Sequence, residues 1–330
     1  MVRSLSKFWL LVIAGIFLLT SFAGVAQVAA QPAGQQTVSG NGFRVSPVTS
    51  EFVIESGQSE VFTITVENPT ESPITAVPVV NDFVPGENED GEALPILDID
   101  ATPPRNSFRS LVSSIDEIEL GPRERKDIDV VISVPEDANA GGYYGIVRFE
   151  PKNLNDVGNV TLAASVGSIA LVRVPGDLTE RMDLEQLSAA QGDSLKSFFT
   201  GGDVSVLVRL KNSGDIHLQP FGRVNVKNMF GDTVASYELN DTNPRAFILP
   251  DTIRRFQDDL DNENWFGRYT IEANLGYSQG GDVLSAETTF WYIPVWALIA
   301  FFVGLGAIAL GIIALVNRRG NKKRSKKSRK

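Results

Sequence analysis

Two stretches with the same pattern decide the fold class: residues 61–70 read VFTITVENPT, and residues 204–214 read VSVLVRLKNSG. In both, apolar and polar side chains alternate, which places the apolar ones on one face of an extended strand. Each strand ends at an asparagine, Asn68 or Asn212, and residues that favour turns follow it. The pattern therefore predicts two strands that are each closed by an asparagine turn.

The same order of signals occurs twice along the chain. After the asparagine turn comes a leucine turn, which is Leu120-Gly121-Pro122 in the first half and Leu249-Pro250 in the second. A strand with glycine and tyrosine follows, and it contains Gly142-Tyr143-Tyr144 or Gly267-Arg268-Tyr269. The late tyrosine resembles the anchoring aromatic residue of immunoglobulin-like domains. This weak repeat indicates two domains of one kind.

Further short strands are expected at intervals of roughly 8–12 residues, which is typical of antiparallel sandwiches. They are residues 125–134, 160–174, 221–226, 233–239, 269–277 and 283–292. No long helical stripe interrupts them. We therefore predict an all-β fold of two tandem immunoglobulin-like β-sandwiches, residues 41–175 and 176–291, with a C-terminal transmembrane α-helix. The boundary falls at the turn residues Pro175-Gly176-Asp177, and residues 31–40 form a linker.

Charge is distributed unevenly along the 330 residues. The chain has 30 Lys+Arg and 40 Asp+Glu, a net charge of −10. Two basic residues lie in 1–30, and nine basic residues with no acid lie in 292–330, which leaves 19 basic and 40 acidic residues between them, a net charge of −21. So acidic a body repels phosphate, which argues against nucleic acid as a partner. The absence of cysteine excludes disulfides and thiolate chemistry.

Both ends of the chain indicate a membrane. Residues 1–30 have the pattern of a signal peptide, with Arg3 and Lys7 before an apolar stretch at 8–19; Val28-Ala29-Ala30 and Gly24-Val25-Ala26 are alternative cleavage sites. An uncleaved N-terminal anchor is the other interpretation. Residues 293–316 are long and apolar enough for a transmembrane helix, and the basic tail 317–330 places its end in the cytoplasm. We expect a single-pass protein of the cell membrane with the bulk of the chain extracellular.

The predicted span carries two further patterns. Aromatic residues at its outer edge, Trp291, Tyr292 and Trp296, suit the membrane interface. Small residues form a stripe along one helical face, at Ala297, Ala300, Gly304, Ala307, Gly311 and Ala314. Such a stripe allows close packing against a second copy or a partner helix, although Ala and Gly are common in spans.

Several turn motifs resemble the Gram-positive WxL-interacting surface protein family. They are Phe43-Arg44-Val45-Ser46-Pro47, the run Asn212-Ser213-Gly214-Asp215-Ile216-His217, and Phe290-Trp291-Tyr292-Ile293-Pro294. The resemblance implies a signal peptide, two immunoglobulin-like domains, a span and a basic tail. It also implies a first domain that binds peptidoglycan and a second that contacts surface or host proteins. The matched positions are architectural, so no binding residue is carried over.

Few residues point to chemistry. Two acidic stretches offer hard oxygen ligands for Ca²⁺, although neither has the pattern of an EF-hand loop and solvated loops are the alternative. They comprise Asp82, Glu87, Glu89, Asp90, Glu92, Asp98 and Asp100, and the run Asp258-Asp259-Leu260-Asp261-Asn262-Glu263-Asn264. The single histidine, His217, lies near Ser213 and Asp215, but turn chemistry explains all three. Trp265-Phe266 is the best exposed aromatic pair, and packing at the end of the sandwich is its alternative.

These observations favour a non-enzymatic, membrane-anchored binding or scaffold protein of the cell surface, without a cofactor and with a protein or cell-wall polymer as ligand. A chaperone-like assembly factor for a secreted client is the second interpretation, because both functions use sandwich edges. An accessory subunit of a membrane complex, held through the small-residue stripe, is the third.

The stripe makes a prediction of its own. Replacing Gly304 and Gly311 together by Leu is expected to weaken association of the span, because the larger side chains hold the helix backbones apart. A membrane two-hybrid assay with the isolated span measures this. An unchanged signal would contradict the packing face.

Overall fold

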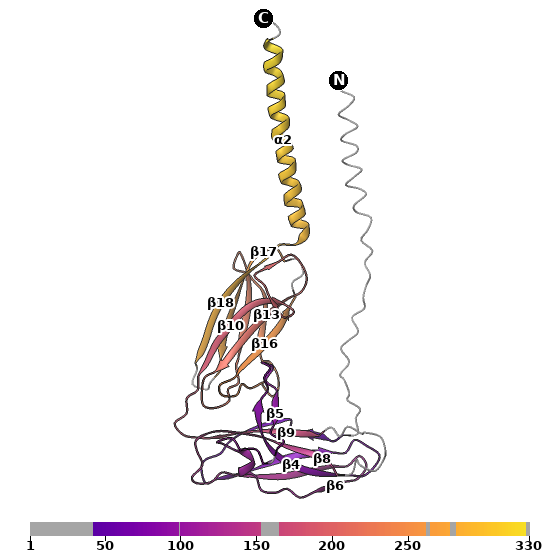
Figure 1. The fold of residues 1–330 in the computed structure, drawn as a ribbon, viewed down its shortest axis with the longest axis vertical. Coiled ribbons are helices and arrows are strands. Elements are labelled where there is room, and N and C mark those ends of the chain that lie inside the picture. The colour runs from indigo at the N-terminus through magenta and orange to yellow at the C-terminus, as the bar shows by residue number, and fades with distance from the viewer. Residues whose placement is uncertain (1–41, 99, 153–164, 262–264, 278–281, 328–330) are drawn as a thin grey trace. The chain divides into compact units, whose positions relative to one another are not determined.

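The computed structural model describes residues 42–98, 100–152, 165–261, 265–277 and 282–327, with side chains of the last helix described to residue 314. The predicted signal peptide, 1–30, and the linker, 31–40, lie outside this part. Figure 1 shows layered β-strands followed by one long helix, α2 (Val295–Lys327). The predicted all-β architecture, two sandwiches followed by a C-terminal helix, is confirmed.

The first sandwich consists of a small sheet and a larger one. The small sheet has the order β1 (Arg44–Ser46), β3 (Ser59–Glu67), β7 (Arg125–Ser133). The larger sheet has the order β2 (Thr49–Val53), β9 (Val166–Val174), β8 (Gly141–Pro151), β4 (Ile74–Pro85), β5 (Ala93–Pro95), with β6 (Ile118–Leu120) beside β4. A 3₁₀ turn, η1 (Phe108–Leu111), buries two side chains between them.

The second sandwich has the same kind of architecture. Its four-stranded sheet has the order β11 (Ser194–Leu195), β10 (Met182–Gln191), β13 (Val204–Asn212), β16 (Ile253–Leu260). Its five-stranded sheet has the order β12 (Phe198–Phe199), β18 (Val283–Tyr292), β17 (Gly267–Gly276), β14 (Phe221–Asn228), β15 (Thr233–Leu239). The main core clusters separate between Val174 and Met182, beside the predicted boundary.

The alternation read from the sequence corresponds to burial. Phe62, Ile64 and Val66 of β3 all lie in the first core, and the four apolar residues at even positions in β13 lie in the second. In β13 the intervening Ser205 and Leu207 are buried as well. This strand is therefore covered on both faces, whereas β3 keeps one face in solvent.

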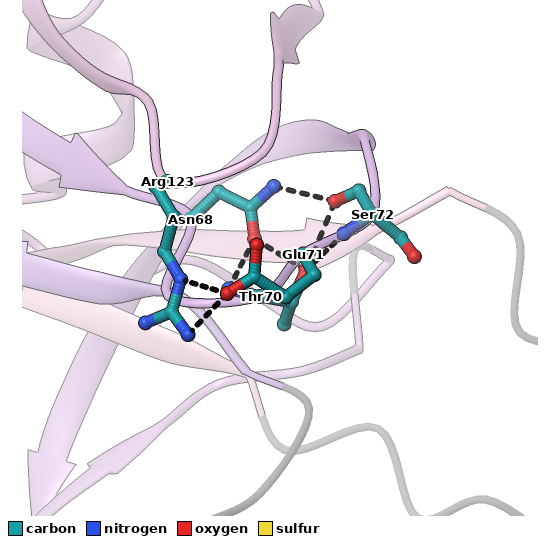
Figure 2. A network of polar contacts seen from close by, with 5 residues as sticks. All are labelled: Asn68, Thr70, Glu71, Ser72 and Arg123. Atoms are coloured by element: carbon teal, nitrogen blue, oxygen red, sulfur yellow. Dashed lines mark hydrogen bonds and ion pairs between the residues drawn. The ribbon is translucent and has the colours of Figure 1, made fainter.

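The repeat rests on two buried asparagine side chains. Asn68 is fully buried, and its Nδ2 donates to the carbonyl oxygens of Ser72 at 2.8 Å and Gly121 at 2.9 Å. Its Oδ1 accepts hydrogen bonds from the backbone N–H of Thr70 at 2.9 Å and the hydroxyl of Thr70 at 2.8 Å. Figure 2 shows this network beside the Glu71–Arg123 ion pair. One amide side chain thus holds a turn and ties it to the leucine turn 52 residues and more away.

Asn212 does the same in the second sandwich. It is also fully buried, and its Nδ2 donates to the carbonyl oxygens of Ile216 at 2.7 Å and Ile248 at 2.8 Å. Its Oδ1 accepts a hydrogen bond from the backbone N–H of Gly214 at 2.9 Å. The two asparagines are therefore equivalent in structure as well as in sequence.

The partner turns share a backbone conformation, although their hydrogen-bond acceptors differ. Arg123 and Asp251 both adopt the left-handed conformation, with φ of 57° and 59°. The backbone N–H of Arg123 donates to Thr70 O at 3.0 Å, and that of Asp251 donates to Asn212 O at 2.9 Å. The carbonyl that meets the asparagine belongs to Leu120 in one copy and Ile248 in the other. Leu120 therefore corresponds to Ile248. The sequence motif instead pairs Leu120 with Leu249, the next residue.

Helix α2 begins one residue after Pro294. Its segment Val295–Ala314 has a mean hydropathy of 2.6 and is long and apolar enough to cross a membrane. Within this described segment, a side chain built at Gly304 or Gly311 would meet no atom within 4 Å. The small-residue face is therefore uncovered in the single chain, and its packing partner stays a prediction.

The asparagine turns should dominate the stability of each sandwich. Asn212→Ala would leave the carbonyls of Ile216 and Ile248 and the N–H of Gly214 without their partner, so we expect a loss of about 2–4 kcal/mol in the free energy of unfolding. Urea unfolding of the full chain in detergent micelles measures it. Asn225→Ala is the matched control, because Asn225 accepts only a surface hydrogen bond from Ser236. Equal effects of the two substitutions would contradict the role of the buried amide.

Candidate functional site

The second sandwich is open between two edge strands that belong to different sheets. β15 ends the five-stranded sheet and β16 ends the four-stranded sheet, so each pairs with a described strand on one side only. A cleft of about 680 Å³ lies between Val234–Tyr237 of β15 and Asp259–Leu260 of β16. Trp265 and Tyr269 also line it. Its volume falls in the range of small-ligand sites.

Stacked aromatic rings form one wall of the cleft. Trp265 is buried and stacks on Tyr269 with ring centroids 4.5 Å apart and an interplanar angle of 19°. The backbone N–H of Phe266 donates to the hydroxyl of Tyr269 at 2.8 Å, which fixes this corner. Of the aromatic pair singled out in the sequence, Trp265 therefore packs at the end of the sandwich, and Phe266 is exposed.

A buried hydroxyl lies in the opposite wall. The Oη atom of Tyr237 is shielded from solvent, and among the described residues it has no hydrogen-bond partner. Burial raises the pKa of Tyr237, and the charge of Asp258 raises it further. Buried polar atoms are normally satisfied, so an orphaned hydroxyl beside a cleft indicates a place where a ligand group fits.

Asp258 is an acidic residue on the inner side of β16. It lies between Phe256 and Leu260 in the alternation, and both of those side chains contact the core. Burial raises the pKa of Asp258, and the neighbouring Asp259 adds to this effect. A solvated loop is one interpretation of the acidic run 258–264 from its sequence, but the run begins inside the strand β16. Residues 262–264 of the run lie outside the described part. Asp259 and Asp261 line the cleft, and their charges make it attractive to a cation.

The outer edges of β15 and β16 differ in how they are covered. The backbone N–H of Arg255 in β16 donates to Glu89 O at 2.6 Å, so the loop that follows β4 pairs with this edge. The carboxylate of Glu89 also forms a bidentate ion pair with Arg209. No described backbone group pairs with the outer edge of β15. β15 is therefore the longer free edge beside the cleft.

The first acidic stretch is used for structure. Asp82 is buried and accepts hydrogen bonds from the hydroxyl of Ser107 at 2.7 Å and the backbone N–H of Arg109 at 3.0 Å. Asp90 and Asp98 each accept a bond from the backbone N–H two residues later. In the described part of the chain, no three acidic or histidine side chains converge as metal ligands. Binding of Ca²⁺ stays a prediction for both stretches, and the second is only partly described.

His217 and its sequence neighbours do not converge on one site. The buried His217 ring lies 3.0 Å, Nε2 to Oε1, from Glu51, and this hydrogen bond is the main reason why the pKa of Glu51 is lowered. The hydroxyl of Ser213 donates instead to Asp183 at 2.7 Å, and Asp215 accepts from the backbone N–H of Thr179 at 2.8 Å. His217 therefore joins the two sandwiches, next to the small apolar cluster of Phe83, Leu171, Phe247 and Leu249.

The predicted membrane-interface aromatics divide into two groups. Trp291 and Trp296 are exposed, as expected for that role. Tyr292 is buried in the second core and stacks on Phe199 at 6.4 Å, so its ring is not available to lipid headgroups. The physical reason is the alternation of β18, which turns Tyr292 inward and Trp291 outward.

No family model matches the sequence, and no curated protein matches it. Among solved structures, the class 5 fimbriae chaperone CfaA is similar at 12% identity, over 77% of this chain and 100% of that chain, with a TM-score of 0.38. The E. coli chaperone DraB is 12% identical over 74% of this chain and 98% of that chain, with a TM-score of 0.36. The Pseudomonas aeruginosa CupB2 chaperone is 11% identical over the same shares, with a TM-score of 0.31. The resemblance to WxL-interacting proteins stays a prediction.

The position of Asp258 makes a prediction about pH. Its raised pKa means that the folded state holds the proton more tightly than the unfolded state, so ionisation destabilises the fold as pH rises above the usual value of 3.8. Asp258→Asn should therefore raise the urea midpoint of the second sandwich at neutral pH. This increase in the urea midpoint should vanish below pH 3.8, where the carboxyl group is protonated in both the folded and the unfolded state.

Tryptophan fluorescence of the full chain in micelles follows this transition, because Trp265 is buried in the same sandwich. Asp203→Asn, at an exposed acid before β13, is the matched control for the loss of a carboxylate at the surface of the same sandwich. A gain of equal size at both pH values would contradict the assignment to ionisation.

Proposed function

We propose that this chain is a non-enzymatic, membrane-anchored protein that binds an extended segment of another protein along β15. The observation that supports this most directly is a seven-residue edge strand with a free outer side next to an aromatic, acidic cleft. A free strand edge presents unpaired N–H and C=O groups, which an incoming strand satisfies.

The cleft gives this binding its chemical preference. A side chain from the added strand reaches the space between β15 and β16, where it meets Asp259, Asp261 and the Trp265–Tyr269 stack. A lysine or arginine suits both features, since its charge pairs with the carboxylates and its stem packs on aromatic rings. We therefore propose a basic residue at the centre of the bound segment.

An inward carboxylate on an edge strand has a second interpretation, which is protection against edge-to-edge aggregation. The orphaned Tyr237 hydroxyl favours the binding interpretation, because protection alone needs no buried group without a partner. The two interpretations differ in whether the edge is occupied in the cell, which crosslinking measures.

The anchor is the helix α2. Its apolar segment Val295–Ala314 fits a single span, and the basic residues after it support a cytoplasmic C-terminus by the positive-inside rule. The two sandwiches would then lie outside the cell, held at the membrane by one helix. A long-lived complex there makes the chain a surface scaffold, and a short-lived one makes it an assembly factor for a secreted client.

A photo-crosslinker placed at the cleft tests the proposal. The chain has no cysteine, so Val234→Cys can be labelled with a benzophenone maleimide on intact cells. Val131→Cys in β7 is the matched control, because the two valines are 40% and 42% exposed. We expect adducts at position 234 that map by mass spectrometry to one extended segment containing Lys or Arg. Asp259→Asn, which removes a carboxylate that lines the cleft, should lower their yield about tenfold, the equivalent of about 1.4 kcal/mol.

The outcomes separate the alternatives. Equal adducts at both positions, or adducts that map to no common segment, would overturn binding at β15. When newly made protein is pulse-labelled and crosslinked at successive chase times, a falling adduct yield supports the assembly factor, whereas a constant yield supports the scaffold. Adducts to peptidoglycan in place of protein support the cell-wall interpretation.

A further inference from the structure

The hairpin between β14 and β15 presents an apolar tip to solvent. At the tip are Met229 and Phe230, and Phe230 is 82% exposed, the most exposed large apolar side chain among the described residues. A phenylalanine at the end of a hairpin gains nothing from the core of its own domain. Such a residue indicates a contact surface.

Hydrogen bonds within the turn restrain the conformation of the tip. The side-chain oxygen of Asn228 accepts hydrogen bonds from the backbone N–H groups of Phe230 at 2.9 Å and Asp232 at 3.0 Å. The backbone N–H of Gly231 donates to Asn228 O at 3.0 Å, and Gly231 has a φ of 90°, which suits glycine. The turn therefore holds Phe230 outward and does not let it fold back onto the sandwich.

The tip lies at the end of the sandwich from which α2 leaves. The Cε atom of Met229 occupies the position where a Cβ on Gly267 would stand, so the methionine fills the space that this glycine leaves. Gly267 is paired with Tyr292, three residues before α2 begins. Phe266 is 55% exposed, and its ring stacks on Trp296 in the first turn of α2 with centroids 6.4 Å apart.

Hydrogen bonds fasten α2 to this end. The backbone N–H of Ile293 donates to Phe199 O at 2.8 Å, and that of Val295 donates to Thr200 O at 3.1 Å. The first turn of the helix therefore begins at the surface of the sandwich, without a free linker between them. When α2 crosses a bilayer, the sandwich end has to lie at its headgroup layer.

We propose that Met229 and Phe230, together with Phe266, insert into the headgroup layer of the bilayer that α2 spans. This inference rests on the membrane anchoring proposed above. The occupant is lipid because the apolar tip continues the apolar surface of α2, whose described span is fully exposed in the single chain. The exposed Arg268 beside Phe266 fits the same surface, since cationic side chains attract anionic headgroups.

Insertion at two places, the helix and the hairpin tip, restricts rotation of the second sandwich about the axis of α2. The edge strand β15 starts at this hairpin, so the contact would hold β15 and its cleft at a fixed height above the membrane.

Environment-sensitive labels test the proposal on the full chain in liposomes of phosphatidylcholine and phosphatidylglycerol. Phe230→Cys, Val131→Cys and Leu305→Cys are each labelled with nitrobenzoxadiazole, and nitroxide lipids quench any label that reaches the bilayer. Position 305 reports the span, 230 the tip, and 131 the aqueous reference on the first sandwich. We expect quenching at 305, and quenching at 230 about threefold above that at 131, from a label buried in the interface.

Each other outcome has a distinct meaning. Quenching at 305 with equal values at 230 and 131 overturns the tip insertion and leaves the anchor in place. No quenching at 305 overturns the anchor and the tip together. A blue-shifted label at 230 that nitroxide lipids do not quench identifies a protein contact, either a second copy or a partner, and also overturns the proposal. Phe230 makes no core contact, so its replacement does not endanger folding.

Discussion

One buried amide side chain in each sandwich is the constraint on which the fold depends. An asparagine in the core must satisfy both its N–H₂ and its carbonyl oxygen, since unpaired polar groups there are costly. Asn68 and Asn212 do so only when the turn after their own strand and a turn some 36–53 residues later are both in place. Each amide therefore couples a local turn to the long-range closure of its sandwich. The weak repeat in the sequence therefore reflects the same asparagine-turn structure in both sandwiches.

The sequence predicts those strands whose burial follows simple alternation. β3, β15 and β18 lie where the pattern places them, because one face of each is mostly apolar or regularly alternating. β4, β10 and β16 carry no such signal. β4 contains Pro78 within its length, and β16 reads IRRFQDDL, in which charged side chains occupy both faces. Their pairing is set by neighbouring strands far away in the sequence, and a local pattern does not contain this information.

The sequence predicted some residues of the candidate site but not their arrangement. Trp265 and the acidic run were visible as unusual residues, and the turn after Asn212 was visible as architecture. Asp258 faces inward because of the register of β16 against β13. Tyr237, which has no hydrogen-bond partner among the described residues, lies in one cleft with Trp265 because two different sheets meet there. The strand that carries the acid is also the one that alternation missed, because an inward carboxylate removes the apolar signal that identifies a strand.

The residues that break local rules lie on β15 and β16 and at the end of the second sandwich from which α2 leaves. An inward aspartate lies on β16, and the Tyr237 hydroxyl, without a partner among the described residues, lies beside the cleft. An exposed phenylalanine lies at the tip of the neighbouring hairpin. Each of them lowers the stability or solubility of an isolated domain. Their common location on β15, β16 and the turn before β15 argues that they serve contacts made by the anchored protein. A domain that only separated the first sandwich from the membrane would have no reason to keep them.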